Sequence, residues 1–233
     1  MKPKLGIWNV LPDENLTFQL PQYFDFIYVD LEHGFRSISE LLTTIRFYNT
    51  NGVDFSVRVR RFDDPLIQTL LDSGVRNFIL PQLRSIKELE IVKSSIQFPP
   101  HGIRGLHPKS NLKINSALNE DVSITVIVET KEALDLVENL AKESIVKDIY
   151  FGSYDLSMDL ELKDGPFSIE LEGYFQAVNK VCKTFGKNLV VMLPNRSDMS
   201  FARINSLNKV VVGIDSILVE DMFDDLTSKL RGT

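Results

Sequence analysis

The strongest constraint on the fold is an alternation that repeats eight times along the 233 residues, in which a short apolar run is followed by a stretch with helical spacing. Short apolar runs between turn signals are typical of strands buried in a parallel sheet. Helical connections between such strands require parallel pairing through right-handed crossovers. The pattern predicts one TIM (β/α)8 barrel over residues 1–233, with a doubly wound open sheet as the alternative. The predicted strands are Leu5–Val10, the apolar part of Phe24–Gly34, Asp54–Val59, Asn77–Leu83, Val122–Val128, Asp148–Gly152, Asn188–Leu193 and Lys209–Gly213.

The stretches between the strands place apolar residues three and four positions apart, as amphipathic helices do. Ser37 and Glu40 have the spacing of a capping box, and Pro65 suits the first turn of a helix. No linker or composition break indicates a second domain, and the irregular stretch from Gln97 to Asp121 is long enough to expect a functional role. The predicted helices are Glu14–Leu20, one from Ser37, one from Asp64-Pro65, Ser85–Ser95, Lys131–Ala141, Ile169–Phe185, Ser200–Leu207 and Asp215–Leu230.

Composition argues against several classes of protein. The net charge is -6 and the pI is about 5.2, which disfavours binding to nucleic acid. The chain has no signal-peptide core and no apolar run of about 18 residues, so we expect a cytoplasmic protein without a membrane segment. The single cysteine, Cys182, cannot form an intramolecular disulfide, and its helical surroundings predict a buried thiol.

Polar and ionisable residues gather where the predicted strands end. Asp30, Glu32 and His33 close the second strand. Because unpaired polar groups are costly to bury and barrel strands open on one mouth, we expect a ligand site there. The alternative is that the acids cap the next helix and that His33 is a surface loop residue. The other strand-end residues are Asn9, Arg58, Arg60, Gln82, Arg84, Glu129, Ser153, Asp155 and Asn195.

Glu129 and Asp155 follow adjacent strands, which brings both carboxylates to the same mouth. Two carboxylates suit a hard cation such as Mg²⁺ or Mn²⁺ and leave positions for substrate and water. Zinc is disfavoured because the chain has only three histidines and no His/Cys ligand spacing. Each acid alone is explained equally well by the dipole of the helix that follows it, so it is their coincidence that favours a metal site.

Several segments, taken in order, carry a family resemblance. They are Asp30-Leu31-Glu32-His33, Val57-Arg58, Leu70-Leu71-Asp72-Ser73-Gly74, Phe98-Pro99-Pro100-His101-Gly102-Ile103-Arg104-Gly105, Val128-Glu129-Thr130-Lys131-Glu132-Ala133-Leu134 and Gly152-Ser153-Tyr154-Asp155-Leu156-Ser157. Together they resemble the HpcH/HpaI aldolases, metal-dependent (class II) lyases that cleave 4-hydroxy-2-oxo acids and 2-keto-3-deoxy sugar acids to pyruvate. The resemblance covers nearly the whole chain, and citrate lyase β subunits and malyl-CoA lyases are more distant members of the same superfamily.

The resemblance implies roles for individual residues. Glu129 and Asp155 match the two protein ligands of the metal, which would be Mg²⁺ or Mn²⁺ with Co²⁺ as a further candidate. His33 matches the general acid/base, paired with a carboxylate at the position of Asp72, and Arg58 matches the arginine that stabilises the pyruvate enolate. The remaining site expectations are Ser153, Tyr154 and Gln82 as substrate contacts, and Asp30 and Glu32 as groups that orient the imidazole or metal-bound water.

The family also forms oligomers in which the last helix packs on a neighbouring subunit. The resemblance therefore implies a homo-oligomer, a trimer or a hexamer, in which Asp215–Leu230 makes this contact. A small-molecule 2-oxo acid is the expected partner.

The chain departs from the family pattern in several places, one of which is Met158-Asp159-Leu160-Glu161, where the family usually has a glycine. Tyr154 replaces a small residue beside the pyruvate, Ile127 replaces a glutamine near the substrate, and Leu106-His107-Pro108-Lys109 replaces a small turn that holds the substrate carboxylate. The metal and acid/base residues remain intact. Two alternatives to a pyruvate aldolase follow: an acyl-CoA or citrate-type lyase of the same superfamily, or a barrel that has lost catalysis and binds a ligand, with Tyr154 in its pocket.

Overall fold

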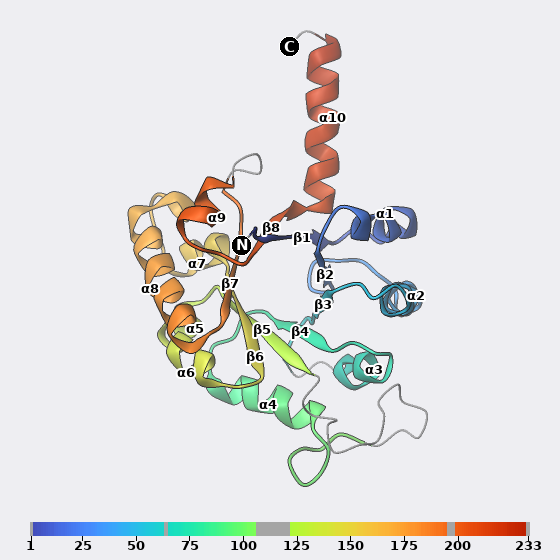
Figure 1. Cartoon of the computed structure of the whole chain (residues 1–233), viewed down its shortest axis with the longest axis vertical. Coiled ribbons are helices and arrows are strands. Elements are labelled where there is room, and N and C mark those ends of the chain that lie inside the picture. The colour runs from blue at the N-terminus through green and yellow to red at the C-terminus, as the bar shows by residue number, and fades with distance from the viewer. Residues whose placement is uncertain (1, 63–64, 106–121, 195–198, 232–233) are drawn as a thin grey trace.

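Eight parallel strands close into a barrel in which each strand pairs with the next and β8 pairs with β1 (Figure 1). The computed structural model describes residues 2–62, 65–105, 122–194 and 199–231. The predicted TIM barrel is therefore confirmed, and the open-sheet alternative is wrong. The strands are β1 (Lys4–Asn9), β2 (Phe26–Asp30), β3 (Phe55–Arg58), β4 (Asn77–Leu80), β5 (Ser123–Val128), β6 (Val146–Phe151), β7 (Asn188–Met192) and β8 (Lys209–Ile214).

Helices surround the barrel, and most lie where the sequence predicts them (Figure 1). The capping box is present, because Glu40 N–H donates to Ser37 Oγ at 3.2 Å and Ser37 N–H donates to Glu40 Oε2 at 2.7 Å. The helices are α1 (Glu14–Gln19), α2 (Ile38–Thr50), α3 (Leu66–Asp72), α4 (Ile86–Ile96), α5 (Lys131–Asp135), α6 (Val137–Lys142), α7 (Ser153–Asp159), α8 (Ile169–Phe185), α9 (Ser200–Ile204) and α10 (Asp215–Arg231), with short 3-10 turns at Leu20–Gln22 and Gly165–Phe167.

Two helical features differ from the prediction. The single helix expected over Lys131–Ala141 is divided at Leu136 into α5 and α6. Helix α7 was not predicted, because it begins directly after β6 and its first residues, Ser153 to Asp155, were interpreted as the end of the strand. This helix matters for the site, since its first turn carries Ser153, Tyr154 and Asp155.

The core has two layers. The larger one lies between the strands and the surrounding helices and contains the buried Cys182. The smaller one fills the barrel interior and is unusually aromatic, with Trp8, Phe26, Tyr28 and Tyr150 among its members. At the amino ends of the strands, this interior is closed by the buried ion pair between Lys209 Nζ and Asp148 Oδ2 at 2.7 Å.

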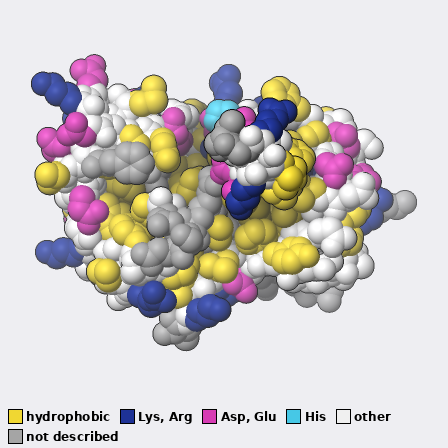
Figure 2. All heavy atoms as spheres, turned by 90° about the horizontal axis from the view of Figure 1, so that it is seen from above, with side chains coloured by type: hydrophobic (Ala, Val, Ile, Leu, Met, Phe, Trp, Pro, Cys, Tyr) yellow, Lys and Arg dark blue, Asp and Glu magenta, His cyan; other side chains and the backbone are white. Residues whose placement is uncertain are grey.

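The last helix, α10, projects away from the barrel (Figure 1). Only its first residue, Asp215, is buried, and it accepts hydrogen bonds from Asn9 Nδ2 and from the backbone N–H groups of Val10 and Leu11. Met222, Phe223 and other apolar residues of α10 are exposed. Viewed from above, the molecule exposes many hydrophobic side chains among charged ones (Figure 2). The expected packing of α10 on a neighbouring subunit stays a prediction.

Two further expectations concern the periphery. The irregular stretch after α4 is described only as far as Gly105, so the residues Leu106–Lys109 lie outside the described residues, as does Asn195. No helix in the described ranges is both long and apolar enough to span a membrane.

The barrel interior leaves no room for a side chain at Gly6. A Cβ atom built there would lie 2.1 Å from Cε2 of the Phe26 ring. We expect Gly6→Ala to destabilise the protein by about 1–3 kcal/mol, because the ring has to move inside a packed core. The measurement is the free energy of unfolding in urea. The control is Gly173→Ala in the middle of α8, where nothing lies within 4 Å of the added Cβ and the substitution should be neutral or stabilising. Equal effects of the two substitutions would contradict the packing described here.

Candidate active site

A cavity of about 620 Å³ opens at the carboxyl ends of the barrel strands. Its floor is the upper part of the aromatic interior, with Trp8 and Tyr150 in its wall. Ionisable side chains on or just after β2, β3, β5 and β6 and in α7 converge on it, as the barrel topology requires for residues near the ends of different strands. These residues are Asp30, His33, Arg58, Glu129, Tyr150, Tyr154 and Asp155.

Arg58, the last residue of β3, organises one half of this cavity. Its Nε and Nη2 donate to the two carboxylate oxygens of Asp30 at 2.8 and 2.5 Å, and its Nη1 lies 3.1 Å from Glu32 Oε2. The guanidinium carbon also lies 4.5 Å from the centre of the Trp8 ring. Burial alone would lower the pKa of Arg58, but the hydrogen bonds and charge of Asp30 outweigh it and raise the pKa overall. Arg58 is therefore a fixed cation that faces the cavity.

Asp30 also shapes the loop that carries the histidine. Its Oδ1 accepts the backbone N–H of Glu32 at 2.9 Å and that of His33 at 3.4 Å. The His33 side chain is 70% exposed, lines the cavity, and has its Nε2 3.9 Å from Glu32 Oε2. The backbone of His33 is thus fixed at the mouth, while its exposed imidazole can contact a ligand in the cavity.

The other half of the cavity contains two acids. Glu129, just after β5, is only 3% exposed, and its Oε1 accepts the backbone N–H of Gln82 at 2.5 Å. Burial raises the pKa of Glu129 to about 7, and the negative charges of Asp155 and Glu32 add to this effect. Asp155 reaches the same cavity from the first turn of α7.

Gly152 allows α7 to start close to Glu129. A Cβ at this glycine would lie 2.8 Å from the Cβ of Glu129. The short Gly-Ser-Tyr-Asp connection therefore brings Asp155 toward Glu129, and any side chain at position 152 would push the two elements apart.

The charges in the cavity do not balance. Arg58 is paired with Asp30 and Glu32 and also attracts Glu129, so the four acids Asp30, Glu32, Glu129 and Asp155 outweigh the charge of this guanidinium. Glu129 is buried while Asp155 is exposed at the mouth, and the burial of Glu129 together with the excess of negative charge explains its raised pKa. Two carboxylate oxygens beside open space fit Mg²⁺ or Mn²⁺, which keep positions for water and substrate. In the described part of the chain, no group of three or more His, Cys, Asp or Glu side chains could hold a metal ion, so the pair would rely on such additional ligands.

The structure does not place Asp72 beside His33 within the chain. Asp72 is the last residue of α3, which leads from the carboxyl end of β3 back to the amino end of β4. Its carboxylate binds Nη2 of the buried Arg104 at 2.5 Å. Glu32 is a carboxylate near His33 in this chain, and the expected pairing of His33 with Asp72 stays a prediction.

The remaining expected substrate contacts are placed as follows. Ser153 and Tyr154 line the cavity, and Tyr154 is 58% exposed, so its ring stands at the rim and leaves the interior open. Gln82 contributes its backbone: with a φ of 52° it turns its N–H toward Glu129 while its side chain is exposed. Gln82 thus positions a proposed metal ligand.

Sequence reasoning missed Trp8 and Tyr150. Trp8 carries the Arg58 guanidinium on its face and donates from Nε1 to the Tyr150 hydroxyl at 3.2 Å. Burial raises the pKa of Tyr150 to about 12, so its phenol stays protonated. The strand period of two would have found both residues, because Gly6, Trp8 and Tyr150 share the inward face with other members of the interior cluster.

Fold and cavity together define a (β/α)8-barrel enzyme with an acidic site at the carboxyl ends of its strands. The model of one such family, the HpcH/HpaI aldolase/citrate lyase family, matches residues 4–220. The chain belongs to this family, and the protein is an enzyme of the lyase class.

Individual relatives carry different named reactions. A pyruvate aldolase of Rhizobium etli is 23% identical over 226 residues, covering 94% of this chain and 89% of that protein. A 5-keto-4-deoxy-D-glucarate aldolase of Escherichia coli is 25% identical over 238 residues, covering 99% and 91%. At these identities the reaction of this protein has to be argued from its own cavity.

Solved structures share the fold. An HpcH/HpaI aldolase from Desulfitobacterium hafniense superposes with a TM-score of 0.87 at 19% identity, covering 100% of this chain and 94% of that one. The citrate synthase SbnG superposes with a TM-score of 0.84 at 23% identity, covering 99% and 95%.

The raised pKa of Glu129 gives a test of the cavity's electrostatics without added metal. Because folding raises this pKa from 4.5 to about 7, the folded state holds the proton more tightly than the unfolded state. The corresponding stability is present below pH 4.5 and is lost as the pH rises through 7. Glu129→Gln is neutral throughout and should be more stable than the wild type at pH 8, by roughly 1–3 kcal/mol.

The measurement is urea unfolding in a chelator at several pH values between 5 and 8. The control is Glu132→Gln, an exposed acid in α5 that pairs with Arg84 outside the cavity. A wild type and a Glu129→Gln variant with the same pH dependence would show that Glu129 is not a buried, repelled carboxylate.

Proposed function

We propose that this protein is a metal-dependent aldolase that cleaves or forms a 4-hydroxy-2-oxo acid or 2-keto-3-deoxy sugar acid, with pyruvate or a related 2-oxo acid as the enolate partner. The observation that carries the proposal is that one cavity contains a fixed cation, Arg58, on one side and two acids, Glu129 and Asp155, on the other. The cation suits an anionic 2-oxo acid, and the two acids suit a divalent metal ion.

In the cleavage direction, three events have to be assisted. The 4-hydroxyl proton leaves, the bond between C3 and C4 breaks, and its electron pair passes to C3 to give an enolate and an aldehyde. His33 is assigned as the base that takes the hydroxyl proton, because an imidazole titrates near neutral pH and this one lies at the cavity mouth. Protonation of the enolate at C3 then gives pyruvate.

The enolate oxygen is the atom on which negative charge develops. Arg58 is assigned to bind it, since Asp30, Glu32 and the Trp8 ring hold the guanidinium before the substrate arrives. A divalent cation held by Glu129 and Asp155 would supply further positive charge to the chelated 2-oxo acid. Asp30 is assigned to position both Arg58 and the His33 backbone.

The alternatives have less support. An acyl-CoA or citrate-type lyase would keep the same enolate chemistry, but the two relatives described above, which match over more than nine tenths of this chain, are named as aldolases. A catalytically inactive binding barrel requires Tyr154 in the pocket, and its 58% exposure at the rim disfavours that arrangement.

Release of pyruvate from a panel of 4-hydroxy-2-oxo acids and 2-keto-3-deoxy sugar acids tests the proposal, with Mg²⁺, Mn²⁺ or Co²⁺ added after chelation. Arg58→Lys should lower kcat/KM by about 10²–10³-fold, because an ammonium cannot make the two parallel bonds to Asp30 and a contact to the enolate together. His33→Ala and Glu129→Ala should reduce the rate at least as strongly. Arg84→Lys is the matched control, since Arg84 is an exposed arginine that pairs with Glu132 and Asp159 outside the cavity. Full activity of His33→Ala would remove the assigned base.

A further inference from the structure

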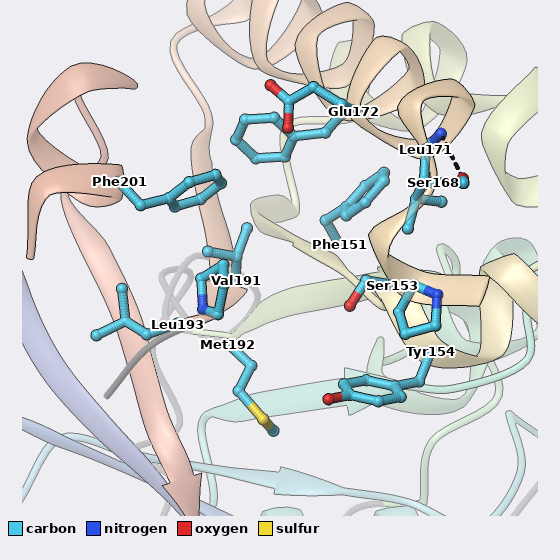
Figure 3. Close-up of a pocket in the computed structure, with 13 residues that line it drawn as sticks. Phe151, Ser153, Tyr154, Ser168, Leu171, Glu172, Val191, Met192, Leu193 and Phe201 are labelled. Atoms are coloured by element: carbon cyan, nitrogen blue, oxygen red, sulfur yellow. Dashed lines mark hydrogen bonds between the residues drawn. The ribbon is translucent and has the colours of Figure 1, made fainter. Parts of the chain in front are cut away.

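A second cavity, which we call the side pocket, lies beside the central one. Its volume is about 260 Å³, and it is formed between the outer faces of β6 and β7 and the helices α7, α8 and α9. Figure 3 shows Phe151, Val191 and Leu171 around this space, with Phe201 of α9 on the far side. The proposed chemistry uses none of these four side chains.

The side pocket adjoins the central cavity. Phe151, Ser153, Tyr154 and Met192 line both of them. In Figure 3, Met192 and Tyr154 lie at the side of the pocket where these shared residues meet. The boundary is adaptable, because Tyr154 is 58% exposed at the rim and Met192 is a flexible side chain that is only partly buried against the barrel interior. A ligand bound at Arg58 and Glu129 therefore has an adjoining space into which it can extend.

The walls of the side pocket are apolar and built by packed rings. Phe151 and Phe175 are in edge-to-face contact with ring centroids 5.6 Å apart, and Phe175 and Phe201 lie 5.2 Å apart. For comparison, a buried apolar cavity of about 150 Å³ accommodates benzene. At about 260 Å³ the side pocket has room for a phenyl ring or an alkyl chain of several carbons.

The charge of the side pocket disfavours ligands that carry a carboxylate. Among the lining residues that the structure describes, none is Lys, Arg or His, and the carboxylate present is Glu172, an exposed residue of α8. An acidic group placed here would meet the like charge of Glu172. A carboxylate-bearing acceptor half, as in a sugar diacid, is therefore disfavoured.

We propose that the side pocket binds the non-reacting part of the aldehyde half of the substrate, and that this part is apolar, an alkyl or aryl group. The inference rests on the proposed aldolase function and specifies its acceptor. The boundary between the reacting carbon and the apolar tail is then formed by Tyr154, Met192 and Phe151. This boundary gives the large side chain at position 154 a physical role.

The test measures the aldol reaction of pyruvate with each of three acceptor aldehydes in the presence of Mn²⁺. Hexanal is apolar, succinic semialdehyde carries a carboxylate, and glycolaldehyde is too short to reach the side pocket. We expect kcat/KM for hexanal to exceed that for succinic semialdehyde at least tenfold, since each methylene in a fitting apolar pocket contributes about tenfold or more. A preference for succinic semialdehyde in the wild type would overturn the inference.

Two variants locate the effect. Val191→Phe fills the pocket and should lower kcat/KM for hexanal about tenfold while leaving glycolaldehyde within twofold. Glu172→Lys, an exposed change that preserves the core, should raise kcat/KM for succinic semialdehyde about fivefold. The matched control is Glu170→Lys, which is exposed two residues earlier on α8 and does not line the pocket. An unchanged ratio of hexanal to succinic semialdehyde in Glu172→Lys overturns the inference, whatever the stability of Val191→Phe.

A separate readout distinguishes this inference from the proposed function. Exchange of the pyruvate methyl protons with deuterated water, followed by NMR, requires the enolate chemistry alone. Exchange with no acceptor preference would overturn the side-pocket inference and leave the aldolase proposal standing. Absence of exchange with every metal would overturn both.

Discussion

The paired hydrogen bonds between Arg58 and Asp30 are the interaction on which the site depends. They join the ends of β2 and β3, and the same carboxylate fixes the backbone of the His33 loop. The cation is held from below by the Trp8 ring, so its position is set by the barrel interior as well as by charge. Because a planar guanidinium with two fixed partners loses little freedom when a ligand arrives, the arrangement is already organised for an anion.

This arrangement also explains why the opposite side of the cavity is acidic. Asp30 and Glu32 bind Arg58 directly, so its charge only partly offsets the repulsion that Asp155 and Glu32 exert on Glu129. A carboxylate that is buried like Glu129 beside other acids costs stability unless a ligand compensates it. The unbalanced charge thus supports a cation-assisted reaction through an argument independent of family membership.

The barrel could be predicted because each strand is an apolar run between turn signals, and because helix ends such as Ser37 carry their own capping residues. The residues after the strands could be predicted to share a mouth, since that follows from topology. Helix α7 could not, because it follows β6 without a separating loop and its polar first turn resembles the end of a strand. The contact of Asp72 with Arg104 could not be predicted, because nothing in the spacing of these two residues along the sequence brings them together. Trp8 is inward-facing by strand alternation, yet its contact with Arg58 depends on three-dimensional packing.

The junction between β8 and α10 contributes residues to the wall of the central cavity. Asp215 anchors the start of α10 to the loop after β1, and the next two residues, Ser216 and Ile217, lie in the cavity wall. The last strand ends at Ile214, so residues 4–214 close the barrel, but the cavity wall also needs Ser216 and Ile217 at the start of α10. Any force on the projecting helix acts on the same few residues that border the ligand. A displacement of the projecting helix α10 would therefore move part of the wall of the candidate active site.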